Sequence, residues 1–121
     1  MPLTRSFKET VQARARRDPA FRDALLTEGV EALLTGDLDT GKVVLRDYIN
    51  ATIGFDGLAK ATGTPSKSLM RMLGPRGNPN ARNLLSVIGH LQRKSGVNLR
   101  VRTASSAASR RMPARSTAAA R

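Results

Sequence analysis

The side chains best suited to chemistry lie between residues 65 and 82 of this sequence. Lys67 and Arg71 stand four residues apart, so in a helix they share one face. An arginine there can offer two parallel donors to O6 and N7 of guanine, the commonest specific contact to a DNA base. Ser66 and Met70 belong to the same face: the hydroxyl could reach a base edge or a phosphate, and the thioether could touch a thymine methyl or pack inward. This stretch predicts a helix that reads base edges.

A loop rich in hydrogen-bond donors follows that helix. Residues 74–80 read GPRGNPN, and the donors in the loop and just beyond it are Arg76, Asn78, Asn80 and Arg82. Side chains and backbone N–H groups at such positions bind phosphate oxygens. We therefore predict phosphate contacts here, and the alternative is an ordinary solvated loop.

Other kinds of site find little support. His90 is the one histidine, no acid follows Asp56, and the sequence has no cysteine, so no metal cluster or thiol chemistry is expected. Asp37, Asp39 and Asp47 could form a carboxylate site, but the segment GDLDTG lacks the ligand spacing of an EF-hand. Helix capping explains these carboxylates better. The sequence predicts no catalytic site and no cofactor.

Charge is distributed unevenly along the 121 residues. All nine Asp and Glu lie in the first 56 residues together with eight Lys and Arg, a net charge of −1. Residues 57–121 hold the other thirteen Lys and Arg and no acid, which brings the whole chain to +12. Such a cationic half favours a polyanionic partner, nucleic acid ahead of a membrane, and the alternative is a merely solubilising surface. With no apolar run long enough to span a bilayer and no signal-peptide core, we expect a cytoplasmic protein.

Apolar spacing predicts the helices that place these side chains. The predicted helices cover residues 4–17, 19–35, 40–52, 55–62, 65–73 and 80–95. We expect Asp18 with Pro19 to open the second helix and Asn80 to cap the last, because Asp and Asn accept backbone N–H hydrogen bonds and proline suits the first helical turn. In the last helix one face is expected to hold Leu84, Leu85, Ile88 and Leu91.

The two short helices before the loop suit a helix-turn-helix. Leu58 faces inward on the first helix, and Leu69 and Leu73 bury the second. Gly63 lies at the turn between them, where a positive φ is easiest for glycine. In a helix-turn-helix the second helix enters the major groove of DNA. An ordinary helical hairpin that binds nothing is the alternative.

Two segments of different composition follow the last predicted helix. In residues 97–102 apolar and polar side chains alternate, which predicts one short β-strand. A lone strand leaves backbone groups unpaired, so we expect two copies of the chain to pair here as a homodimer. Residues 103–121 are mostly Ala, Ser and Arg with little to bury, and they are expected to form a disordered basic tail.

These motifs resemble those of known DNA-binding families. The residues LA at 58–59, G at 63, PSKSLMRML at 65–73 and GNP at 77–79 resemble the helix-turn-helix of the Cro and lambda repressor type. Over roughly residues 15–102, the run from DPAFRDALL through GDLDTGKVVLRDYI to GNPNARNLLSVI also resembles the addiction-module antidote proteins, the HigA-type antitoxins. That resemblance implies a dimer that binds its own operator in double-stranded DNA and co-represses with a RelE-like toxin. The chain departs from the family in its Arg-rich tail.

We therefore predict an all-α protein, a five-helix lambda repressor-like helix-turn-helix domain with a short C-terminal β-strand. Residues 1–36 are expected to form an N-terminal helical segment, 37–96 the DNA-binding domain, 97–102 the dimerising strand and 103–121 the tail. The expected function is sequence-specific transcriptional regulation, in which the protein represses its own operon and neutralises a RelE-like toxin. The alternatives are a stand-alone regulator without a toxin and an architectural DNA-binding protein.

Overall fold

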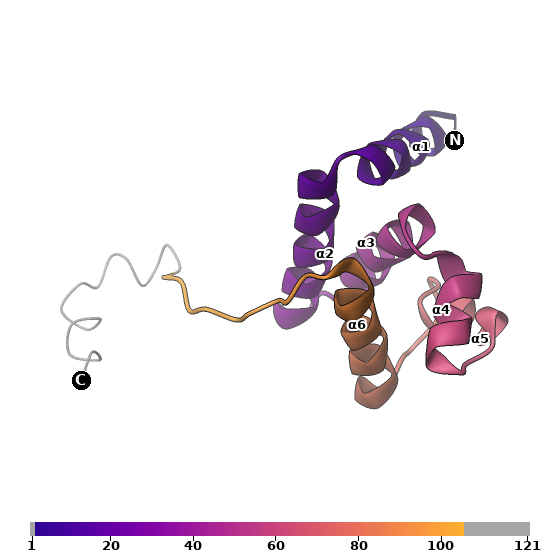
Figure 1. The fold of residues 1–121 in the computed structure, drawn as a ribbon, viewed down its shortest axis with the longest axis vertical. Coiled ribbons are helices and arrows are strands. Elements are labelled where there is room, and N and C mark those ends of the chain that lie inside the picture. The colour runs from indigo at the N-terminus through magenta and orange to yellow at the C-terminus, as the bar shows by residue number, and fades with distance from the viewer. Residues whose placement is uncertain (1, 106–121) are drawn as a thin grey trace.

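The computed structural model describes the backbone of residues 2–105 and the side chains from residue 10 onward. This part of the chain is all-helical, as predicted (Figure 1). Its six helices are α1 (Pro2–Arg17), α2 (Pro19–Leu34), α3 (Leu38–Ala51), α4 (Gly54–Thr62), α5 (Ser66–Met72) and α6 (Ala81–Ser95). These six helices correspond to the six segments predicted from apolar spacing, one more than the five of the predicted repressor-like arrangement. None of these helices combines the length and apolar character needed to cross a bilayer.

Side-chain caps fix where three of the helices begin. Asp18 accepts a hydrogen bond from the backbone N–H of Phe21 at 3.2 Å, and Pro19 occupies the first turn of α2. Asn80 accepts one from the N–H of Asn83 at 2.8 Å at the start of α6. Both caps confirm the prediction. Asp37 likewise accepts from the N–H of Thr40 at 3.2 Å, so α3 begins at Leu38, two residues earlier than predicted.

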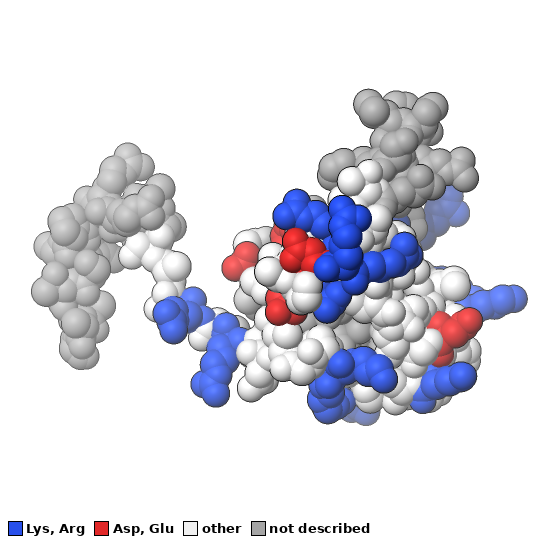
Figure 2. Space-filling model, turned by 45° about the horizontal axis from the view of Figure 1, so that its top comes forward, with Lys and Arg blue, Asp and Glu red and all other residues white. Residues whose placement is uncertain are grey.

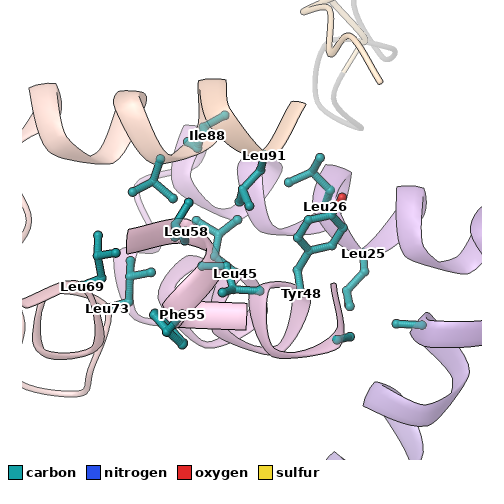
Figure 3. Close-up of a cluster of buried hydrophobic side chains, with 14 residues drawn as sticks. Leu25, Leu26, Leu45, Tyr48, Phe55, Leu58, Leu69, Leu73, Ile88 and Leu91 are labelled. Carbon is teal, nitrogen blue, oxygen red and sulfur yellow. The ribbon is translucent and has the colours of Figure 1, made fainter. Parts of the chain in front are cut away.

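One hydrophobic core joins all six helices (Figure 3). Its largest fully buried side chains include Leu26 from α2, Tyr48 from α3, Leu58 from α4 and Leu91 from α6. Short helix α5 contributes Leu69 and, just past its end, the segment contributes Leu73. Because α5 has only seven residues, this burial rather than its own helical propensity holds it in place.

The buried face of α6 differs from the prediction at one position. Leu85 was expected to share a face with Leu84 and Ile88, yet its side chain is 65% exposed, and Val87 is buried instead. Successive residues are rotated by about 100° around the helix axis, so Leu85 points away from the face on which Leu84 lies. Val87 and Ile88, three and four residues after Leu84, lie on that face.

The segment after α6 is extended and belongs to no strand of the described residues. Gly96 ends the helix in the left-handed region with φ +77, and residues 97–105 have no regular secondary structure. The predicted strand at 97–102 is therefore not present in the described residues, because a strand requires a neighbour to receive its backbone hydrogen bonds. Leu99 is half-buried and donates its N–H to Gln92 Oε1 at 2.8 Å, whereas Val101 is 82% exposed. The predicted tail lies outside the described residues beyond Ser105.

Candidate nucleic-acid interface

Helices α4 and α5 pack against each other across a short turn. Gly63 follows α4 with φ +76, as predicted, and donates its N–H to the carbonyl of Ala59 at 2.8 Å. Leu58 on α4 and Leu69 on α5 are both buried, so the two helices share part of the core. In the view of Figure 1, α4 and α5 lie on the side of the molecule opposite the extended segment that follows α6.

The outer face of α5 carries three of the predicted contact residues. Lys67 and Arg71 are exposed, and Met70 is 49% exposed, as expected from their spacing relative to the buried Leu69. This short helix therefore presents two cations and one thioether to solvent.

Ser66 does not belong to this outer face. Its Oγ atom is fully buried and has no hydrogen-bond partner among the described residues, although Ser66 was predicted to point outward. The reason is its register: Ser66 precedes the buried Leu69 by three residues, so the two lie on the same side of the helix. The hydroxyl cannot reach a base or a phosphate in this conformation.

A groove of about 380 Å³ lies between α5, the following loop and the first turns of α6. It brings together four predicted contact residues, whereas Lys67, Met70 and Arg82 are exposed outside it. The polar residues that line it are Thr62, Thr64, Ser68, Arg71, Arg76, Asn78, Asn80, Asn83 and Ser86. No sequence pattern predicted Ser68, Asn83 or Ser86 for this groove, because these residues come together only when α5 and α6 fold against the loop.

The electrostatics of this groove favour an anion. Arg71 and Arg76 supply two guanidinium groups, and within the part of the chain that is described no Asp or Glu lines the groove. The N-terminus of α6 also opens here, with Asn80 capping it through Asn83, and the positive end of a helix dipole attracts negative charge. Elsewhere acids are present: Figure 2 shows Asp and Glu in two limited areas of one face, among more widely spread Lys and Arg.

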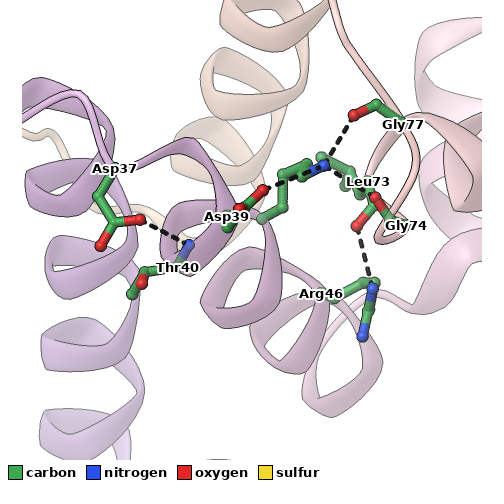
Figure 4. Close-up of polar contacts among 8 residues, drawn as sticks. Asp37, Asp39, Thr40, Arg46, Leu73, Gly74 and Gly77 are labelled. Carbon is green, nitrogen blue, oxygen red and sulfur yellow. Dashed lines mark hydrogen bonds and ion pairs between the residues drawn. The ribbon is translucent and has the colours of Figure 1, made fainter.

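Two cations that the sequence analysis missed lie beneath the loop (Figure 4). Lys42 on α3 is only 3% exposed, and its Nζ donates to the carbonyl of Gly74 at 2.9 Å and of Gly77 at 2.7 Å. Arg46, one turn further along α3, donates from Nη1 to the carbonyl of Leu73 at 3.1 Å. A signal was present in the sequence, because Lys42 precedes the apolar Leu45 by three residues and so lies on the buried face of α3.

The backbone of the loop approaches the last turn of α5 closely. A Cβ atom on Gly77 would overlap the carbonyl oxygens of Arg71 and Met72, so only glycine fits without a shift of backbone. Gly77 also donates its N–H to the carbonyl of Gly74 at 3.0 Å and closes a four-residue turn. Pro75 and Arg76 occupy the two central positions of this turn, which places the Arg76 side chain at an exposed corner.

The remaining candidate residues stay apart from the groove. Of the three carboxylates Asp37, Asp39 and Asp47, which were predicted to cap helices, only Asp37 does so, at the start of α3. Asp39 forms an ion pair with Lys42 Nζ at 3.9 Å, and Asp47 lies within α3, where the backbone N–H groups already have helical partners. His90 is half-buried on α6, in a separate cleft with Lys60 and other residues. Among the side chains that the structure describes, residues 10–105, no three His, Cys, Asp or Glu gather closely enough to hold a metal ion.

No protein-family model, curated protein or solved structure matches this chain.

Proposed function

We propose that this chain is a sequence-specific DNA-binding regulator in which α4 and α5 form a helix-turn-helix and α5 is the recognition helix. The observation that carries the proposal is the placement of cations on adjoining surfaces. Lys67 and Arg71 are exposed on α5, and Arg71 also lines the neighbouring acid-free groove with Arg76. Exposed cations on a short helix, beside a groove lined by arginine and no acid, suit contact with the major groove of DNA and its adjacent phosphates.

The two surfaces have different tasks in this proposal. Arg71 reads guanine through paired hydrogen bonds, and Met70 contacts a thymine methyl next to it. Arg76, Asn78 and Asn80 hold phosphate oxygens, together with free N–H groups at the start of α6. Arg82 and Lys67 add charge at the edges. Ser66 has no part in the contact, because its hydroxyl is buried.

A homodimer is part of the proposal. The extended segment after α6 exposes Val101, and residues 97–102 belong to no helix or strand of their own chain, so a second copy can pair with them antiparallel. Two recognition helices about 34 Å apart would then meet successive turns of one DNA face. Sedimentation of the full chain at micromolar concentration checks this: a dimer is expected, and replacement of the exposed Val101 by Asp should shift it toward monomer. A monomeric unmodified protein, with and without operator, contradicts the dimer.

The regulatory context follows from the resemblance to antidote proteins. We extend the proposal to repression of the protein's own operon and to neutralisation of a RelE-like toxin. Co-expression of the chain with the protein of a neighbouring small gene checks the toxin: rescue of growth and co-purification support it. Operator binding without any such partner supports a stand-alone regulator instead.

Selection of bound duplexes from a random pool tests DNA recognition directly. We expect enrichment of a two-part site with half-sites one helical turn apart. A specific site should bind at least about a thousandfold more tightly than scrambled duplex at physiological salt. Equal binding to all sequences would identify an architectural protein, and no binding at all would exclude a DNA-binding function.

A further inference from the structure

We infer that Lys42 is a positioning residue for DNA binding, whose buried ammonium holds the turn at residues 74–77 in the shape that contacts phosphate. The inference rests on the proposed function, because it assigns a cause to the geometry of the same groove. It does not place Lys42 in contact with DNA.

The contacts of Lys42 span the whole turn. Its Nζ donates to the carbonyl of Gly74, at the first position, and to that of Gly77, at the last (Figure 4). The turn is closed by the hydrogen bond from the Gly77 N–H to the Gly74 carbonyl. One ammonium therefore binds both ends of the four-residue unit that carries Arg76.

Because the Lys42 ammonium is buried, its charge depends on these two hydrogen bonds. At 3% exposure the ammonium has little access to water, and a buried charge without partners is costly. The neighbouring carboxylate of Asp39 lies 3.9 Å away and is 91% exposed, so it is a weak and solvated partner. The two loop carbonyls are therefore the main partners of the charge, and displacement of the turn would leave it unpaired.

A second cation holds the end of the recognition helix. Arg46 is half-buried and donates to the carbonyl of Leu73, the residue that follows α5. Cations near a helix C-terminus satisfy its last carbonyls and interact favourably with its dipole. Through Lys42 and Arg46, α3 thus fixes both the end of α5 and the turn behind it, before any DNA is present.

This arrangement has a measurable consequence for binding. When a loop is ordered during folding, binding need not supply its ordering entropy. Because the Lys42 charge is bound to internal carbonyls, it neutralises no phosphate and releases no counterion. Lys42 should therefore affect DNA affinity without affecting the salt dependence of that affinity.

The test uses the full chain with Lys42→Met, which keeps a long apolar side chain and removes the charge. We expect faster amide hydrogen exchange at residues 74–80 in the DNA-free protein. The Kd for the selected duplex should rise by about tenfold, with an unchanged slope of log Kd against log salt. The matched control is Lys94→Met, an exposed cation near the C-terminal end of α6 that should leave exchange in the turn unchanged.

A double-mutant cycle identifies the route of the effect. In the Arg76→Ala background, Lys42→Met should reduce DNA affinity much less than it does in the unmodified protein. The reason is that the phosphate contact of Arg76, which Lys42 positions, is already absent. Full additivity, or a salt slope reduced by about one phosphate contact, would overturn the inference. Unchanged exchange at residues 74–80 would overturn it as well.

A measurement on the unmodified protein guards against a variant that does not fold. We expect a slowly exchanging Lys42 ammonium signal in NMR spectra, with scalar couplings across the hydrogen bonds to the Gly74 and Gly77 carbonyls. A rapidly exchanging ammonium contradicts the inference. Failure of the unmodified protein to bind any duplex instead contradicts the proposed function, while exchange in the turn still reports on Lys42.

Discussion

The carbonyl oxygen of Arg71 occupies the space that a side chain at Gly77 would need. Arg71, proposed to read bases, and the end of the turn proposed to bind phosphate are therefore in backbone contact. This contact requires glycine at position 77, because any other residue has a Cβ atom in that space.

Replacement of Gly77 by Ala should lower the free energy of unfolding by about 1–3 kcal/mol, because the new methyl group displaces main chain rather than a flexible side chain. Thermal unfolding measures the change. Gly89→Ala is the control: a Cβ there would meet only the guanidinium of Arg93, at 3.6 Å or more, so this substitution in α6 should stabilise by about 0.5–1 kcal/mol. Equal effects of the two substitutions would contradict the close approach at Gly77.

Arg71→Ala and Arg76→Ala should affect DNA binding differently. Loss of Arg71 should cost about 1–3 kcal/mol on the selected duplex and little on scrambled duplex, since a base contact is lost. Loss of Arg76 should weaken both duplexes similarly and lower the salt slope by about one phosphate contact. Titrations of both variants against both duplexes decide the assignment. If Arg71→Ala weakens both duplexes equally, Arg71 contacts phosphate and α5 does not read bases.

Ser66→Ala should leave specific DNA binding unchanged. The hydroxyl is buried without a partner among the described residues, so its removal should leave the free energy of unfolding unchanged or raise it by up to about 1 kcal/mol. Binding titration and thermal unfolding of the variant measure both quantities. A tenfold loss of affinity on the selected duplex would indicate that the hydroxyl turns outward on DNA.

Acid should weaken two helix caps. The N–H of Phe21, with Arg14 assisting, lowers the pKa of Asp18, and hydrogen bonds from the side chain and backbone of Thr40 lower the pKa of Asp37, each from an ordinary value of 3.8. Since the folded-state pKa is the lower one, these caps stabilise the fold above pH 3.8 and lose their effect as pH falls through the folded value. An asparagine side chain can also cap a helix, but it does not titrate at acid pH. The double variant with Asp18→Asn and Asp37→Asn should therefore show a smaller fall in Tm below pH 4 than the unmodified protein. An identical fall would show that other groups control acid unfolding.

Local features of this fold were predictable from sequence, whereas contacts between distant segments were not. The caps at Asp18 and Asn80 and the positive φ of Gly63 each depend on a few neighbouring residues, and all three agree with the structure. Leu85 was misassigned because two adjacent leucines compete for one helical face. Ser66 was predicted to point outward, but its position three residues before Leu69 places it on the buried side of α5.

The role of Lys42 was missed for a different reason. Its carbonyl partners lie 32 and 35 residues away along the chain, so no local pattern names them. Burial of a lysine on an apolar face signals that some partner must exist, but only the tertiary structure identifies it. The strand at residues 97–102 is a related case, since its expected partner belongs to another copy of the chain.

The way in which α5 is anchored leaves its outer positions free to vary. Leu69 and Leu73 attach the helix to the core, and Arg46 attaches its end through a main-chain carbonyl that every amino acid possesses. Residues 67, 70 and 71 take no part in this anchoring. If α5 is the recognition helix, as proposed, exchange of these three side chains should change the preferred DNA sequence at little cost to the free energy of unfolding.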